Sequence, residues 1–309
     1  MAYCKATRAA LAALAAGTAI LAPASCASGP KNVSVERKNE AAEYSKVADQ
    51  HFALGNYSTA LDFYAQSLDA NLSVDNVEGA IKVRSSIGRV YLAVGKLDEA
   101  EREFGDALED ALALGDGPLL ALCKSNLGDL RYLRGDIDAA GALYAEAEPL
   151  AQGDDAILAI VVHNRGFVAL RKGDLVAAEA FLLQAAKLNE KGLRWNELGS
   201  NRFVLASVYA AKGDLAGAIG WARKALEADK LAEYPAGIGK DLEALAGYLI
   251  KAGEKAEAFD LYRRAFGLWL SIGKDDDAVR CLRVLADLAA ELGKEGYLKR
   301  YQAILNQLG

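Results

Sequence analysis

A glycine recurs at almost constant intervals along this 309-residue chain. Five of the six intervals are forty residues and one is thirty-eight. The glycines are Gly55, Gly95, Gly135, Gly173, Gly213, Gly253 and Gly293. A unit of this length cannot bury a core alone, so consecutive units have to stack on one another. The period therefore predicts an elongated solenoid that acts through its surface rather than through a closed active-site pocket.

Small and bulky residues accompany each glycine at fixed distances. Seven positions earlier stand Ala48, Gly88, Gly128, Gly166, Ala206, Ala246 and Ala286. Five positions later stand Ala60, Ala100, Ala140, Ala178, Ala218 and Ala258, and nine positions later Tyr64, Phe104, Tyr144, Leu182 and Tyr262. Alternation of small and large side chains suits closely packed antiparallel helices, and glycine suits the left-handed end of a helix. Because 52% of residues are hydrophobic and only five are prolines, the composition agrees with an all-α fold.

The order of these residues resembles that of the tetratricopeptide repeat. One unit carries nearly the whole signature, with Ile87, Gly88, Tyr91, Gly95, Leu97, Ala100, Phe104, Ala107 and Leu108. The resemblance implies a right-handed superhelical solenoid of about seven antiparallel helix pairs over residues 41–309. A period near 34 is usual for this family, so forty residues indicate longer helices. The last unit has Leu298 in place of the small residue and is interpreted as a cap.

The start of the chain differs from the repeats. Residues 1–25 have a basic beginning and an apolar run over 9–22, which is typical of a secretion signal and short for a membrane span. Ser25-Cys26 resembles the bacterial lipobox, which implies lipid attachment at Cys26, although Pro23 stands where leucine is expected.

Two locations remain open on this basis. If Cys26 is lipidated, residues 26–40 are expected to be a flexible tether that joins the solenoid to a bacterial envelope membrane. By the resemblance, that protein faces the periplasm and could belong to the outer membrane. Cleavage after Ala24 would instead release a soluble periplasmic or secreted protein.

Charge, cysteines and motifs exclude several classes of function. The net charge is −6 without a basic stripe, which disfavours nucleic-acid binding. Cys123 and Cys281 lie four repeats apart, so we expect free buried thiols rather than a disulfide. With only His51 and His163 and no metal-ligand spacing, neither a metal nor a cofactor is expected. No nucleotide-binding or catalytic motif occurs, so we expect no enzyme.

The resemblance assigns the inner face of the solenoid to the first helix of each unit. Asn126 and Asn164 both stand nine residues before a glycine, and their amides are expected to hold a peptide backbone. The alternative is that each amide bonds a neighbouring helix. The full set of candidate groove residues combines aromatic and polar groups: Arg89, Asn126, Asp129, Tyr132, His163, Asn164, Phe167 and Phe203. Packing between repeats is the alternative role for Phe167 and Phe203.

These features predict a non-catalytic, envelope-anchored adaptor that binds a protein or peptide in its groove. Two other classes stay open. The chain could carry a small hydrophobic ligand between repeats as a transporter helper, or it could assemble with itself through exposed Trp195, Trp221 and Trp269. The sequence names neither the partner nor the oligomeric state.

Overall fold

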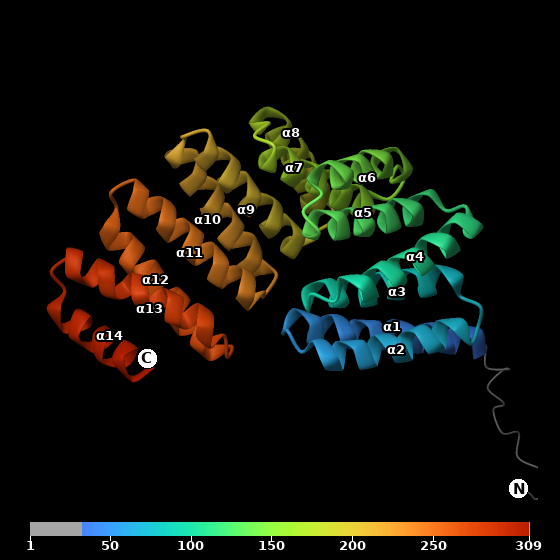
Figure 1. Cartoon of the computed structure of the whole chain (residues 1–309), viewed down its shortest axis with the longest axis horizontal. Helices are drawn as coiled ribbons and strands as arrows, with labels where there is room; N and C mark the ends of the chain where they lie inside the picture. The colour runs from blue at the N-terminus through green and yellow to red at the C-terminus, as the bar shows by residue number, and fades with distance from the viewer. Residues whose placement is uncertain (1–32, 309) are drawn as a thin grey trace, which may run out of the picture.

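The structure, a computed structural model, describes residues 33–308, and all regular structure in that range is α-helical. Fourteen described helices form seven antiparallel pairs that follow one another along a curved stack (Figure 1). The first helices of the pairs are α1 Val33–Ala53, α3 Val77–Ala93, α5 Gly117–Leu133, α7 Asp155–Arg171, α9 Trp195–Ala211, α11 Pro235–Lys251 and α13 Asp275–Glu291. The second helices are α2 Tyr57–Leu72, α4 Leu97–Leu114, α6 Ile137–Leu150, α8 Leu175–Lys191, α10 Leu215–Leu231, α12 Lys255–Ser271 and α14 Glu295–Leu308. The predicted solenoid of about seven helix pairs is confirmed.

Each pair turns at the periodic glycine. All seven of these glycines have a positive φ, as at Gly55 with φ 78° and Gly135 with φ 87°. The links between units need a second left-handed residue, which the sequence analysis did not recognise because only half of the positions are glycine. That series is Asp75, Gly115, Gly153, Leu193, Glu233 and Gly273. Leu193 and Glu233 therefore adopt a backbone conformation that side chains disfavour.

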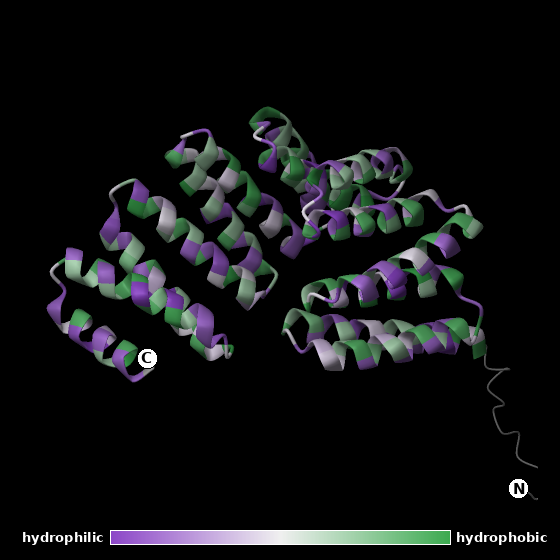
Figure 2. Cartoon of the chain, viewed as in Figure 1, coloured by the Kyte–Doolittle hydropathy of each residue, from purple (hydrophilic) through white to green (hydrophobic). Residues whose placement is uncertain are grey.

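The small and bulky positions of the repeat meet inside each pair. A Cβ added to Gly88 would overlap the ring of Phe104, and one added to Gly128 would overlap the ring of Tyr144. Phe104 is fully buried by this contact. Hydrophobic and hydrophilic residues alternate along every helix (Figure 2), as expected for helices with one buried side.

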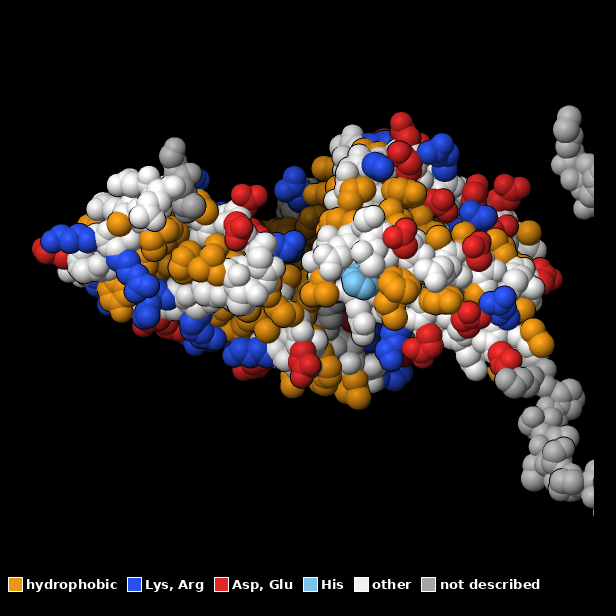
Figure 3. All heavy atoms as spheres, turned by 90° about the horizontal axis from the view of Figure 1, so that it is seen from below, with side chains coloured by type: hydrophobic (Ala, Val, Ile, Leu, Met, Phe, Trp, Pro, Cys, Tyr) orange, Lys and Arg blue, Asp and Glu red, His pale blue; other side chains and the backbone are white. Residues whose placement is uncertain are grey.

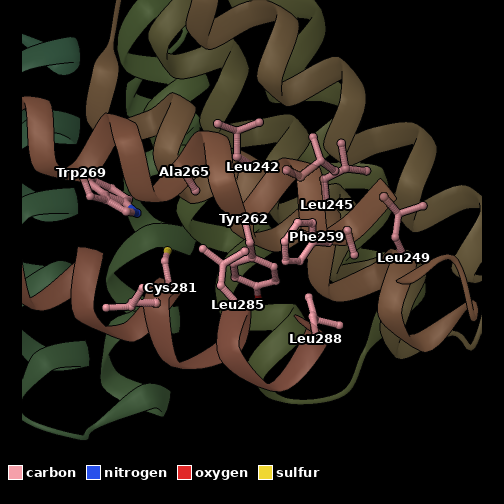
Figure 4. Close-up of a cluster of buried hydrophobic side chains, with 14 of the residues drawn as sticks. Leu242, Leu245, Leu249, Phe259, Tyr262, Ala265, Trp269, Cys281, Leu285 and Leu288 are labelled. Carbon is pink, nitrogen blue, oxygen red and sulfur yellow. The ribbon is translucent and has the colours of Figure 1, made fainter. Parts of the chain in front are cut away.

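The last three pairs share a continuous core. Tyr262, Trp269, Cys281 and Leu285 pack together between α12 and α13 (Figure 4). Trp269 is only 2% exposed and its Nε1 donates a hydrogen bond of 2.7 Å to a carboxylate oxygen of Glu243. The hypothesis of an exposed tryptophan face is therefore wrong for this residue, because the ring fills the space between two helices.

Both cysteines in the described part of the chain are free and buried, as expected. Burial raises the pKa of Cys123 and of Cys281 to about 12, so neither thiol ionises near neutral pH.

The predicted tether is too long at its C-terminal side. Helix α1 begins at Val33, so residues 33–40 are helical rather than flexible. No proline or glycine interrupts this segment after Pro30, and Arg37 pairs with Glu40 across one helical turn at 2.6 Å. The signal segment, Cys26 and the rest of the tether lie outside the described residues. No helix in the described range is long and apolar enough to cross a membrane.

The stack curves until the first unit faces the later units. Ala53 and Leu54, at the end of α1, line a cavity of 360 Å³ together with Tyr234, Pro235 and Ile272 from the links before α11 and α13. Figure 3 shows the two ends of the stack as two lobes with a hollowed surface between them. The curvature therefore encloses the space that the first helices line.

Candidate functional site

A cavity of 420 Å³ lies inside the curve, between the first helices of five consecutive units. Six of the eight predicted groove residues line it: Arg89, Asp129, Tyr132, His163, Asn164 and Phe167. The structure adds six further lining residues: Phe52, Leu92, Leu133, Tyr144, Ser200 and Val204. Phe52 of α1 and Ser200 of α9 face the same space although four repeats separate them. Sequence reasoning missed them because only the curvature of the stack brings them together.

Asp129 of α5 is the polar centre of this cavity. Its Oδ1 accepts hydrogen bonds from the hydroxyl of Tyr144 at 2.6 Å and from Nδ2 of Asn164 at 2.9 Å. Burial raises the pKa of Asp129 to about 6, while the Tyr144 hydrogen bond and the charge of Arg89 oppose the rise. The bond between Asp49 and Tyr64 repeats this arrangement in the first unit. Asp129 therefore joins α5, α6 and α7 and keeps an acidic group at the groove.

Aromatic rings form the apolar part of the cavity. The rings of Tyr132 and Phe167 lie 5.2 Å apart at an angle of 59°, which is a tilted contact between adjacent first helices. Across the cavity, the guanidinium of Arg89 lies 5.7 Å from the centre of the Phe52 ring. The groove therefore offers aromatic faces beside polar groups, a combination found at binding hot spots.

The expected ladder of two exposed amides is not present. Asn126 is only 3% exposed and does not line the cavity, and its Nδ2 has no hydrogen-bond partner among the described residues. Asn164 does line the cavity, but its Nδ2 already donates to Ser125 Oγ at 3.1 Å and to Asp129. The position nine before the glycine is therefore buried in one unit, and in the next it lines the cavity while its amide bonds the neighbouring helix, as the alternative hypothesis expected.

His163 ends a directional chain of hydrogen bonds that joins three helices. Arg194 can only donate, and its Nε bonds Oδ1 of Asn189 at 2.8 Å. Nδ2 of Asn189 must then donate to Oδ1 of Asn201, also at 2.8 Å, which directs Nδ2 of Asn201 toward Nδ1 of His163 at 2.8 Å. His163 Nδ1 is therefore an acceptor, and burial lowers the pKa of the ring to about 4.

A second cavity of 460 Å³ continues the groove toward the C-terminal units. It shares Arg89 and Ser200 with the first cavity, and it contains Phe203, the seventh of the eight predicted residues. Asp229 of α10 and Asp241 of α11 also line it and are 5% and 1% exposed. The sequence analysis missed this pair, although both acids stand at positions that are apolar or amide at the other five links between units.

In the described part of the chain, no group of three His, Cys, Asp or Glu residues is placed to hold a metal ion. The chemistry that the groove offers is recognition by hydrogen bonds, charge and aromatic contact.

Comparison with known proteins supports the repeat assignment. The family model described as tetratricopeptide repeat matches residues 39–113 and 80–153. No curated protein is detectably similar in sequence.

Several solved structures share the fold. BtubC from P. vanneervenii has 18% identity and a TM-score of 0.56, with 72% of this chain and 92% of that chain covered. A Rap protein complexed with Competence and Sporulation Factor has 17% identity and a TM-score of 0.58, with 82% and 76% covered. PilF of Pseudomonas aeruginosa has 19% identity and a TM-score of 0.55, with 75% and 93% covered. At these identities the similarity shows a common helical-repeat fold.

Proposed function

This chain is a tetratricopeptide-repeat protein, and from that premise we propose that it is a non-catalytic scaffold that binds a segment of another polypeptide in its inner groove. The observation that carries the proposal is the continuity of the two cavities, which share Arg89 and Ser200. Together they form an elongated site with aromatic faces and polar groups. A polypeptide segment matches such a site better than a compact metabolite does.

The lining also fits a peptide chemically. Tyr132 and Phe167 offer apolar faces for side chains, while Asn164 and Asp129 offer an amide and a carboxylate near the same surface. Large aromatic side chains supply contact area at low cost in conformational entropy. A similar fold is known with a bound factor in the Rap complex, which is consistent with this use of the scaffold.

A site-specific cross-linker tests the proposal. p-Benzoylphenylalanine replaces Phe167 in the groove or, as the matched control, Val176 on α8, which is 78% exposed. The proteins are irradiated in the cells that make them natively, and captured polypeptides are identified by mass spectrometry. We expect a discrete polypeptide at position 167 that is absent at position 176 and reduced by Arg89→Ala. Equal capture at both positions would contradict groove binding.

Anchoring in the bacterial envelope is part of the proposal and rests on Cys26. We expect labelled palmitate to enter the wild-type protein and not Cys26→Ala, and we expect the variant to leave the membrane fraction. Incorporation in neither protein would favour the simply secreted alternative.

A second candidate function is the binding of a small hydrophobic ligand. The cavity of 360 Å³ that Ala53, Leu54, Pro235, Ala236 and Ile272 help to line is its natural place. Native mass spectrometry of purified protein would detect such a ligand, and Ala236→Trp should displace it. The absence of any bound small molecule would leave the polypeptide groove as the proposed function.

A further inference from the structure

The repeat places a buried residue at the same point of every link between units. It stands sixteen residues after the first-helix glycine, and it faces the residue twelve positions before the next such glycine. The pairs are Asn71 and Val83, Ala111 and Cys123, Ala151 and Val161, Asn189 and Asn201, Asp229 and Asp241, and Trp269 and Cys281. One link alone holds two acids, so the architecture itself does not require carboxyl groups there.

At the two links with a buried asparagine, the chain supplies a hydrogen-bond donor five residues later. Asn76 Nδ2 donates to Asn71 Oδ1 at 2.6 Å, and Arg194 Nε donates to Asn189 Oδ1 at 2.8 Å. The equivalent residue at the acidic link is Tyr234, whose side chain donates no hydrogen bond to either acid. A side chain of the link therefore donates to the buried residue in those two units, whereas none does so at the acidic link, although Arg89 lines the adjoining cavity.

The acids consequently remain incompletely satisfied. Asp229 and Asp241 hydrogen bond each other, yet Oδ1 of Asp229 and Oδ2 of Asp241 are buried and have no partner among the described residues. Burial raises the pKa of both groups, and the charge of Asp229 raises that of Asp241 further. Lys240 weakly opposes these shifts and makes no hydrogen bond to either acid. A buried acceptor without a donor is costly, and a bound cationic donor would relieve that cost.

Both acids border the groove, because they line the 460 Å³ cavity although each is almost fully buried. Gly199 and Gly237 line the same cavity, and the carboxylate of Asp229 occupies the space that a Cβ at either position would fill. Phe203 and Ser200 extend the cavity from the acids to the groove described above. The equivalent cavity of 500 Å³ at the first link contains the neutral Asn71 and Asn76 in place of the acid and the tyrosine.

We propose that the Asp229 and Asp241 cavity is a specificity pocket for the guanidinium or ammonium group of an arginine or lysine side chain in the bound polypeptide. The inference rests on the proposed function and names the chemistry of the partner. The ligand is an organic cation rather than a metal ion, because no third acidic, histidine or cysteine ligand joins the pair. Arg194, which places a guanidinium at the equivalent point one unit earlier, is the internal model for the contact.

A random heptapeptide library displayed on phage provides the test. It is selected on the wild type, on Asp229→Asn with Asp241→Asn, and on a control, Asp98→Asn with Asp138→Asn, which removes two carboxyl groups from exposed positions on α4 and α6. The acid-pair variant recreates the amide pair of the preceding link and is expected to fold, which circular dichroism and thermal melting verify. We expect a basic residue at one position of the peptides selected by the wild type and the control, and its loss with the acid-pair variant.

The selected peptide is then resynthesised with citrulline for arginine, or with norleucine for lysine, and its affinity is measured by calorimetry. The neutral peptide should bind the wild type roughly 10-fold to 100-fold more weakly, as expected for a charge-assisted hydrogen bond, and should bind the acid-pair variant almost as well as the basic peptide does.

The outcomes separate the two proposals. Two results would overturn the specificity pocket and leave groove binding intact. The first is selection of peptides without a basic residue, and the second is an equal loss of affinity for the neutral peptide in the wild type and the acid-pair variant. Selection of no peptide by the wild type would overturn groove binding and the pocket with it.

Discussion

Acid should destabilise the fourth unit through His163. The ring nitrogen Nδ1 of His163 accepts a hydrogen bond from Asn201, and the hydrogen bonds of Asn189 and Arg194 hold the Asn201 amide in this orientation. A proton on Nδ1 would therefore face the N–H donor of Asn201 in place of an acceptor. Burial lowers the pKa of His163 in the folded protein from 6.5 to about 4. The unfolded chain therefore binds this proton first, and stability falls as the pH drops from 6.5 through 4.

The size of this effect follows from the two pKa values. At pH 4, the difference between 6.5 and about 4 for His163 corresponds to a loss of about 3 kcal/mol relative to neutral pH. His163→Gln can still accept from Asn201 but does not titrate. The difference in unfolding free energy between the variant and the wild type should therefore move by about 3 kcal/mol in favour of the variant between pH 7 and pH 4.

Urea unfolding followed by circular dichroism at both pH values measures this difference, and all other titrating groups are common to the two proteins. Asn201→Asp provides a second check, because it replaces the donor to His163 by an acceptor and should reduce the acid loss. If the difference in unfolding free energy between His163→Gln and the wild type does not change with pH, the argument is refuted.

Three further predictions concern packing, backbone strain and the acid pair. Gly88→Ala should destabilise the folded protein by about 1–3 kcal/mol because the added methyl overlaps Phe104, whereas Gly105→Ala on the open side of α4 should stabilise it by about 0.5–1 kcal/mol. The melting temperatures of the two variants should therefore shift in opposite directions. Leu193→Gly should stabilise by about 0.5–1 kcal/mol, since Leu193 has a φ of 54° and is 66% exposed, and an unchanged or lower urea midpoint would contradict strain there. Asp241→Asn should gain stability relative to the wild type as the pH rises from 5 to 8, because the raised pKa of Asp241 makes its ionisation costly in the folded state. The same difference in melting temperature between the variant and the wild type at pH 5 and at pH 8 would count against this prediction.

Local regularities made the fold predictable. The glycine at the end of each first helix and the small residue that faces Phe104 or Tyr144 act within one unit, so their spacing is visible in the sequence. The second left-handed position escaped notice because Leu193 and Glu233 occupy it, and neither residue type indicates a positive φ. The start of α1 at Val33 was missed because the first two turns of this helix are mostly polar and bury no side chain, so their composition resembles that of a tether.

The candidate site was predictable only in part. The inner-face positions correctly brought Asp129, Tyr132 and Phe167 together, because the first helices of adjacent units lie side by side. Asn126 shares its repeat position with Asn164 but is buried and does not line the cavity, so the repeat position alone does not decide which side chains reach the groove.

The sequence by itself determined the repeating unit and the number of helix pairs, because these depend on contacts between residues within a unit or in adjacent units. Only the tertiary structure decided which distant residues share the groove. Small rotations between units add up along the stack until Phe52 meets Ser200 at one cavity and Arg89 meets Asp241 at another. The same accumulation places two acids beside that cavity with no donor hydrogen-bonded to Oδ1 of Asp229 or Oδ2 of Asp241, whereas Arg194 supplies a donor at the preceding link, and no single repeat reveals this difference.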